Sequence, residues 1–224
     1  AFVIAWAPFV SMRSLARDIA SASTERHGER EPWAVDQLTR KVFVRSLTDP
    51  LAPEEAALLR DACAERSAAT PIAAALSETG RAIYPLLTAL DATAANDALN
   101  RLPPALLQRF DTLSPLTWLP EIHASVIHLA HDRDDNVIPI AQSREMLAAL
   151  AGRTGVQYTE FTMFKHLDPS KVHLPLIAMA RELGKFFGAV FPLFRLAVRH
   201  SGDPAAHNAP VRHRPDRKWG SLRS

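Results

Sequence analysis

The sequence predicts an α/β protein in which parallel strands are flanked by helices. Three short apolar runs have the length and composition of buried strands, namely AFVIAWAPF (1–9), HASVIHLAH (123–131) and VQYTEFTMF (156–164). Amphipathic stretches with helical spacing follow the first run and separate the second run from the third. Such an alternation of buried strands with amphipathic helices is typical of a parallel sheet covered by helices.

The first run favours a strand over a helix because it is short, apolar and closed by Pro8. From about residue 20 to residue 120 the pattern predicts helices instead. PEEAALLRDACAERS begins with a proline and two glutamates, which are preferred in a first helical turn. Further short helices are expected in ATPIAAALSETG, RAIYPLLTALDATAANDAL and PPALLQRFDTL, cut by Pro71, Gly80, Pro85, Pro103 and Pro104. We interpret this interval as a helical insertion.

The second half of the chain predicts a strand, a helix and a strand in that order. PIAQSREMLAALAG places Met146, Leu147 and Leu150 on one helical face, between the second and third apolar runs. This order and length fit a parallel crossover. A last helix is expected to start near Pro175, with a stripe of apolar residues that would cover a sheet face: Leu176, Met179, Ala180, Leu183, Phe187, Val190 and Phe191.

Charge, cysteine content and hydropathy limit the function. The formal net charge is only +2, so the composition does not call for nucleic acid as a partner. The single cysteine, Cys63, excludes an intrachain disulfide and fits a reducing compartment, so we expect a cytoplasmic protein. The apolar run FFGAVFPLF has nine residues, fewer than the about 20 that a membrane span needs. Residues 199–224 contain six Lys or Arg and two Asp, a composition that predicts disorder.

Two candidate catalytic residues follow the second and third predicted strands. The stretch HDRDDNVIP contains Asp135, and KHLDP contains His166, 31 positions later. Because catalytic groups of open parallel sheets gather beyond the carboxyl ends of the strands, these two side chains can meet. A carboxylate that orients an imidazole is the basic half of a nucleophilic triad.

These motifs resemble those of the α/β-hydrolase family. Its members commonly carry His-Gly-x-x-Asp-x-x-Val-Pro after the penultimate core strand, and HDRDDNVIP places Asp135 at the triad aspartate. His166 follows the last strand, as the triad histidine does in the family. The resemblance covers residues 112–192 and implies hydrolysis of ester, thioester or peptide-type substrates, with no metal or organic cofactor. Residues 1–20 are similar to the strand and exit that precede the family's variable cap.

The sequence departs from the family pattern at three places. Asp132 replaces the usual glycine, and Lys165 stands where a glycine often precedes the histidine. None of the eight glycines forms Gly-x-Ser-x-Gly, the motif of the nucleophile elbow. Since the serine precedes the acid and the histidine in this fold, we expect a chain that is the second half of a hydrolase, inactive by itself, whose partner is the missing N-terminal half.

The resemblance implies a division of the chain into four parts. Residues 1–20 would form a core strand and its exit, residues 21–120 a helical cap, residues 121–198 the C-terminal part of the hydrolase core, and residues 199–224 the basic tail. The expected ligand is a small ester or peptide-like molecule. Neither nucleic acid nor a stable membrane span is expected.

Other polar residues near these motifs have simpler interpretations. Asp132 and Asp134 are expected to form turns, since aspartate tolerates tight backbone geometry. His128 lies inside a predicted strand and is expected to be a satisfied histidine of the sheet, whereas His131 at the strand exit either lines the site or caps the turn. Two residues outside this stretch are not expected to be nucleophiles: Ser11, which lacks elbow glycines, and Cys63, at an apolar helix position.

Several other functions compete with hydrolysis. Asp132 and Asp134 imitate the Asp-x-Asp of a haloacid-dehalogenase phosphatase, but Asn136 stands where that motif has Thr or Val. A calcium loop counted from Asp132 would have Val137 at the position that requires glycine. A metal site of His128, His131 and the acids lacks known ligand spacing. The strongest alternative is a non-catalytic half-fold that binds a partner or is inert, because its sheet lacks the strands that should cover its edge.

Overall fold

The computed structural model of the chain describes residues 2–26, 28–64, 72–163 and 175–201. The chain divides into two compact units, residues 1–185 and residues 186–224. The first unit contains every strand of the described ranges and all described helices except the second part of α9 (Leu176–Ser201). It is the unit that positions the candidate site.

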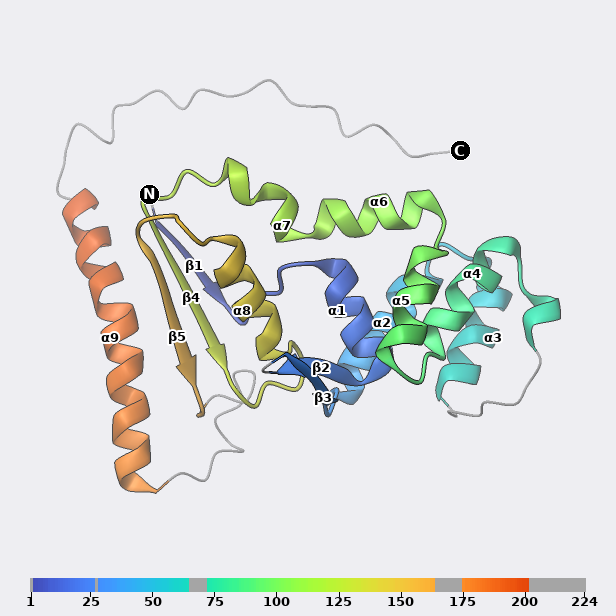
Figure 1. Ribbon diagram of the computed structural model, residues 1–224, viewed down its shortest axis with the longest axis horizontal. Coiled ribbons are helices and arrows are strands. Elements are labelled where there is room, and N and C mark those ends of the chain that lie inside the picture. The colour runs from blue at the N-terminus through green and yellow to red at the C-terminus, as the bar shows by residue number, and fades with distance from the viewer. Residues whose placement is uncertain (1, 27, 65–71, 164–174, 202–224) are drawn as a thin grey trace. The chain divides into compact units, whose positions relative to one another are not determined.

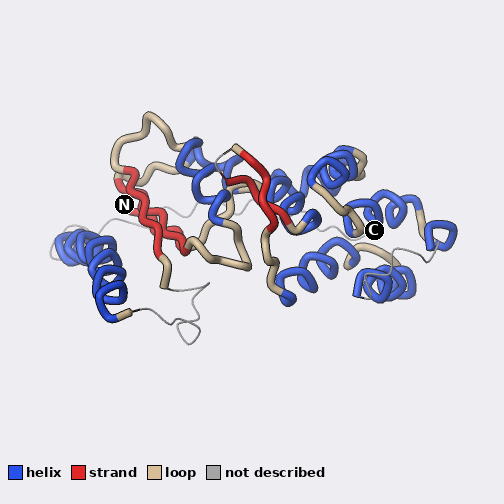
Figure 2. Tube along the Cα trace, turned by 60° about the horizontal axis from the view of Figure 1, so that its bottom comes forward, coloured by secondary structure: helices blue, strands red, loops and turns tan. Residues whose placement is uncertain are grey.

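The first unit contains a three-stranded parallel sheet (Figures 1 and 2). Its strands are β1 (Phe2–Trp6), β4 (Val126–Asp132) and β5 (Val156–Phe161), in the order β1-β4-β5. In the register of the sheet, His128 lies between Ile4 and Gln157. The predicted mixed α/β class with parallel strands is therefore confirmed, with the strands slightly shorter than the apolar runs.

Helix α8 (Ile140–Ala149) connects β4 to β5 and forms a small core with them. Met146 and Leu150 pack with Ile127 and Leu129 of β4. All these side chains are buried, and apolar burial of this kind stabilises by about 25 cal/mol per Å². The predicted strand, helix and strand therefore form one packed crossover.

Helices also fill most of the sequence between β1 and β4. They are α1 (Met12–Ser21), α2 (Gln37–Thr48), α3 (Pro53–Ala64), α4 (Glu78–Leu87), α5 (Ala92–Asn100), α6 (Pro104–Leu113) and α7 (Pro115–Trp118), with 3-10 turns at Ile72–Ala75 and Leu119–Glu121. A larger core with members such as Leu15, Phe43, Ile83 and Phe110 joins them. The short antiparallel pair β2 (Ser23–Arg26) and β3 (Glu29–Pro32), which the sequence pattern did not predict, follows α1 (Figure 2).

The expected breaks at Gly80 and Pro85 were wrong, because α4 runs through both residues. A Cβ atom at Gly80 would lie 1.9 Å from Glu55 Oε1. Glycine thus admits the Glu55 carboxylate, which accepts hydrogen bonds from the backbone and the hydroxyl of Ser77 at the start of α4. Pro85 lies in the last turn, two residues before the helix ends, where only one helical hydrogen bond is lost.

Helix α9 starts at Leu176, as the sequence predicted, but its apolar stripe is not buried. Leu176 is 88% exposed and Leu183 40% exposed. Glu182 is the buried residue of this turn, because its carboxylate accepts from Thr162 N at 3.0 Å and pairs with Lys185 at 2.5 Å. Across the described ranges, no helix is both long enough and apolar enough to cross a bilayer.

The turn before β5 provides a test of this architecture. Gly155 has φ +78°, and a Cβ atom there would lie 2.1 Å from Ser125 O. Gly155→Ala should therefore lower the free energy of unfolding by more than about 2 kcal/mol, through backbone strain and steric overlap. Urea denaturation measures this change.

The matched control is Gly152→Ala. Gly152 has φ +83°, but nothing lies within 4 Å of its added Cβ, so only the strain of about 1 kcal/mol applies. Equal losses in the free energy of unfolding for the two variants would contradict the close approach of Gly155 to the Ser125 backbone.

Candidate active site

The candidate site lies in the loop of residues 133–139, which follows the carboxyl end of β4 and is called the acid loop below because it carries Asp135. Asp132, the last residue of β4, is opposite Phe161, the last residue of β5. The Arg133 backbone N–H donates to Phe161 O at 2.8 Å, and the Phe161 ring stacks on Trp6 of β1 with centroids 5.2 Å apart. The three strand ends therefore meet at one edge, as the sequence predicted.

The Asp135 carboxylate is buried and held from within its own loop. Its Oδ1 accepts hydrogen bonds from Val137 N at 2.7 Å and Ile138 N at 2.9 Å. Its backbone carbonyl accepts from Trp33 Nε1 at 2.9 Å. The side chain is 0% exposed. One oxygen thus anchors the loop, and the other, Oδ2, faces His131 at 3.5 Å.

His131 is also fully buried and fastens the same loop. Its Nε2 lies 2.9 Å from Ile138 O, and its Nδ1 is bonded to Ser143 Oγ. Because a carbonyl can only accept, Nε2 carries the hydrogen. The Ser143 hydroxyl also donates to Pro8 O at 3.2 Å. The turn-capping role that the sequence suggested for His131 is confirmed.

Ser143, His131 and Asp135 together have the connectivity of a nucleophilic triad, yet Ser143 is not placed to act as a nucleophile. All three side chains are buried, so a substrate carbonyl cannot reach the Ser143 hydroxyl. The Nε2 hydrogen is directed at the Ile138 carbonyl, which is nearer than Asp135 Oδ2. The arrangement is a structural clamp around the loop.

The predicted histidine of the site, His166, lies outside the described residues, as does Lys165. The pairing of Asp135 with His166 therefore stays a prediction. What the structure describes is the acid, buried three residues beyond the end of β4.

The other acids of the stretch form a turn, as predicted. Asp132 Oδ1 accepts from Asp134 N at 2.9 Å, and Asp134 itself is exposed. In the part of the chain that the structure describes, no three His, Cys, Asp or Glu side chains are grouped so that they could hold a metal ion. Asp132 thus shapes the backbone ahead of Asp135.

His128 is a satisfied histidine of the sheet, which confirms its interpretation from sequence. Its Nδ1 is 3.1 Å from Gln157 Oε1 and its Nε2 is 3.1 Å from Thr159 Oγ1, both on β5. Burial lowers the pKa of His128 below 6.5, although the Gln157 contact opposes this. The neutral ring therefore links two strands.

Glu160 is a positioning residue that sequence reasoning missed. Its carboxylate pairs with Arg133 of the acid loop at 2.7 Å and with Arg144 of α8 at 2.9 Å. Burial alone would raise the pKa of Glu160, but the hydrogen bonds from the two arginines outweigh it and lower the pKa to about 2. The available signal was a single glutamate inside the otherwise uncharged run VQYTEFTMF.

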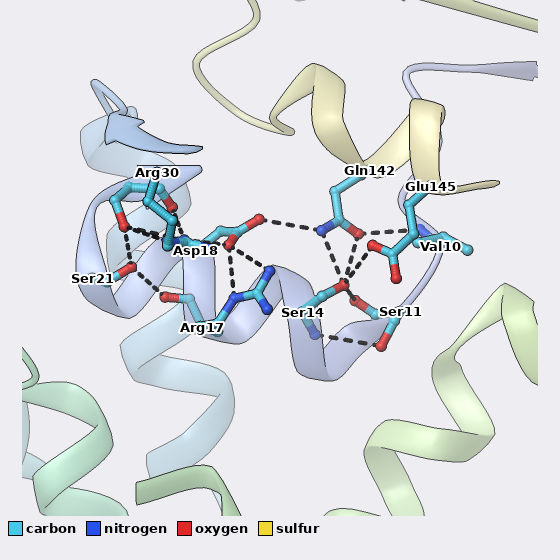
Figure 3. Close-up of polar contacts among 10 residues, drawn as sticks. Val10, Ser11, Ser14, Arg17, Asp18, Ser21, Arg30, Gln142 and Glu145 are labelled. Atoms are coloured by element: carbon cyan, nitrogen blue, oxygen red, sulfur yellow. Dashed lines mark hydrogen bonds and ion pairs between the residues drawn. The ribbon is translucent and has the colours of Figure 1, made fainter. Parts of the chain in front are cut away.

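A second polar cluster, also missed, joins the exit of β1 to α8 (Figure 3). Gln142 Nε2 donates to Ser14 Oγ at 3.0 Å and to Asp18 Oδ2 at 3.3 Å, and Gln142 Oε1 accepts from Val10 N at 3.3 Å. Gln142 is only 1% exposed. Its place one turn before Met146, on the apolar face of α8, was the signal in the sequence.

The remaining members of this cluster complete its anchoring role. Asp18 pairs with Arg17 at 3.1 Å and with Arg30 at 2.7 Å. Ser11 is the N-cap of α1, and its hydroxyl accepts from Ser14 N at 3.3 Å. The Ser11 side chain thus has the capping role that serine commonly takes at a helix start, in keeping with the expectation that it is not a nucleophile.

Cys63 packs, partly buried, against the helical core, as predicted. Burial raises the pKa of its thiol above 9.0, although Arg40 opposes this. A thiol with a raised pKa is a poor nucleophile at neutral pH.

An apolar groove lies beside the acid loop. Its volume is about 440 Å³, and Val137 and Ile138, the two residues whose amides hold Asp135, form part of its wall. Helices α1, α2 and α6 supply most of the other walls, with lining residues that include Leu15, Leu38, Val42, Phe43, Phe110 and Leu113. A volume in this range suits a small organic ligand.

The Glu160 anchor gives a prediction about pH. A carboxyl whose pKa is lowered on folding stabilises the protein fully above its unfolded pKa, and this contribution is lost as the pH falls from about 4.5 toward about 2. Glu160→Gln should therefore be less stable than the parent at pH 6, and the difference should shrink steadily below pH 4.5. Urea denaturation at pH 6, 4 and 3 measures it.

Glu121→Gln, at an exposed position, controls for the loss of one negative charge. A Glu160→Gln difference that stays constant from pH 6 to pH 3 would contradict the paired carboxylate.

Compared with protein-family models, with curated proteins and with solved structures, the chain has no match. Its function is therefore argued from the buried acid, the loop that holds it and the groove beside it.

Proposed function

We propose that this chain is the acid-bearing and histidine-bearing part of a serine hydrolase of the α/β-hydrolase type. The observation that carries the proposal is the buried Asp135 carboxylate at the carboxyl end of a parallel strand, held by two backbone amides. A carboxylate fixed in this way can orient an imidazole and stabilise its protonated form. His166, five residues after the end of β5, is the imidazole that the resemblance assigns to it.

In the proposed reaction, His166 removes the proton of a serine hydroxyl as the oxygen attacks the acyl carbonyl. The imidazolium then returns that proton to the leaving alcohol, thiol or amine as the carbonyl–leaving-group bond breaks. Water, deprotonated by the same imidazole, releases the acyl group as an acid and regenerates the serine. Asp135 orients the ring in both halves of the cycle. The serine and the amides that stabilise the oxyanion come from the nucleophile-bearing half of the fold.

The outer edge of β1 supports the need for that half. Phe2, Val3 and Ile4 are 39%, 36% and 47% exposed. Because neighbouring residues of a strand point to opposite faces, both faces of β1 are open here. Parallel sheets normally have both faces covered. An apolar edge strand that is open on both faces suits pairing with a further parallel strand, which the nucleophile-bearing half would supply.

The groove supports an apolar acyl group as the part of the substrate that is bound. Leu38, Val42 and Leu113 are 67%, 54% and 51% exposed and line it. Val137 and Ile138 of the acid loop form part of its wall. We therefore propose esters or thioesters with an apolar acyl chain as the substrate class.

Asp135→Asn tests the role of the acid in a protein that also carries the nucleophile. Asparagine keeps an oxygen for the amides of Val137 and Ile138, so the loop should keep its shape. The maximal rate of ester hydrolysis should nevertheless fall by about 10²- to 10⁴-fold, because a neutral amide does not stabilise the imidazolium. Asp134→Asn, at the exposed neighbour, should change the rate less than about twofold.

Equal losses in the two variants would show that Asp135 is not the acid. The 224-residue chain alone should hydrolyse p-nitrophenyl acetate no faster than its His166→Ala variant. Robust turnover that depends on His166 would contradict the placement of the nucleophile in another half. A chain that pairs with such a half but stays inactive would support the non-catalytic binding alternative, which the open β1 edge also favours.

Val42→Asp tests the groove in this chain itself. A carboxylate in the apolar wall should weaken the binding of a fluorescent octanoyl ester by at least about tenfold, because part of the charge is desolvated when the ligand binds. Fluorescence titration gives the two dissociation constants. Leu90→Asp, at a residue that is 89% exposed and does not line the groove, is the matched control. Equal weakening by both substitutions would argue against the groove as the binding site.

A further inference from the structure

Helix α9 carries an exposed apolar stripe that neither the candidate site nor the groove uses. Its large exposed apolar side chains are Leu176 (88%), Ile177 (87%), Leu183 (40%), Phe187 (63%), Phe191 (61%) and Phe194 (65%). With 3.6 residues per turn, all of these except Ile177 fall on one narrow face of the helix. Three phenylalanines stand within eight consecutive residues of that face. Isolated exposed apolar residues are ordinary, but a continuous stripe marks a binding surface.

The helix has more basic than acidic residues. Its sequence has four basic residues, Arg181, Lys185, Arg195 and Arg199, and one acid, Glu182. Glu182 is only 5% exposed, and its carboxylate is bonded to Thr162 N and to Lys185. The acid is thus withdrawn from the surface, whereas Arg181 is exposed. Because Lys185 is paired with Glu182, Arg181 is the exposed positive charge among the described side chains of the helix.

We propose that α9 binds the surface of a membrane that contains anionic lipids, as an interfacial helix lying in the plane of the bilayer. Basic amphipathic helices with phenylalanine and leucine on the apolar face bind in this way, because apolar burial and attraction to anionic headgroups add. The helix lies on the bilayer rather than across it, consistent with the lack of any spanning helix in the described ranges. Phe187, Phe191 and Phe194 enter the boundary between headgroups and acyl chains.

The charge of the helix favours lipid over a second copy of the chain. A second copy of the chain would bring the same excess of positive charge against this face, and like charges at close range repel. By contrast, each basic residue near an anionic membrane raises the affinity of the helix for that membrane about fivefold. The proposal does not depend on the hydrolase activity, since none of these residues belongs to the candidate site.

Sedimentation of the full chain with vesicles tests the proposal. The chain should bind vesicles of 70% phosphatidylcholine and 30% phosphatidylglycerol at least about tenfold more tightly than pure phosphatidylcholine vesicles, and 0.5 M NaCl should reduce this preference. The triple variant Phe187→Ser, Phe191→Ser, Phe194→Ser should lose at least about tenfold in the partition coefficient. Arg181→Glu should lose at least about fivefold, selectively on the anionic vesicles.

Two matched controls keep the result interpretable. Leu90→Ser removes a side chain that is 89% exposed outside α9, and Arg101→Glu reverses an exposed charge at the end of α5; both should bind anionic vesicles as the parent does. Circular dichroism confirms that each variant keeps its helices. Absence of vesicle binding, or equal binding by the triple variant and the parent, would overturn the proposal. So would a dimer in light scattering that the triple substitution abolishes while vesicles fail to bind.

Discussion

The position of β4 between β1 and β5 is the constraint on which the first unit depends. Because both pairings are parallel, all three strands end at the same edge. The acid loop, the stacked rings of Trp6 and Phe161 and the start of α8 can therefore assemble there from distant parts of the sequence. The polar anchors of the candidate site hold a loop whose position is set by these two strand pairings.

The acid loop is held from several directions at once. Trp33 binds its backbone from the helical region, His131 clamps it from β4, and Glu160 ties it to β5 and α8 through two arginines. Each anchor comes from a different element, so no single fluctuation of one element releases the loop. Such redundancy is what a carboxylate needs if it is to hold a partner ring in a defined orientation.

The sequence predicted those features that depend on local patterns. The parallel strands, the helix between β4 and β5, the turn at Asp132, the place of His128 in the sheet and the turn-capping role of His131 follow from apolar spacing and turn chemistry. The anchors by Gln142 and Glu160 were missed, because the sequence marks the two residues but not their distant partners. The same reason explains the wrong breaks in α4, where Glu55 occupies the space that Gly80 leaves. Distance in the sequence also explains why the apolar stripe of α9 was wrongly expected to be buried: the buried residue is Glu182, which accepts from the backbone N–H of Thr162 after β5.

Gln142 has a consequence for how the groove can change over evolution. By joining Val10, Ser14 and Asp18 to α8, it makes α1 part of the rigid frame of the sheet. The N-terminal end of α2 is likewise tied to the acid loop, since Asp36 N donates to Asn136 O at 2.8 Å. The outer wall of the groove, at Leu38 and Val42, can therefore be substituted while the acid keeps its place. In the proposed hydrolase, selectivity can therefore drift at Leu38 and Val42 without loss of the chemistry, whereas Val137 and Ile138 line the groove and also hold the carboxylate.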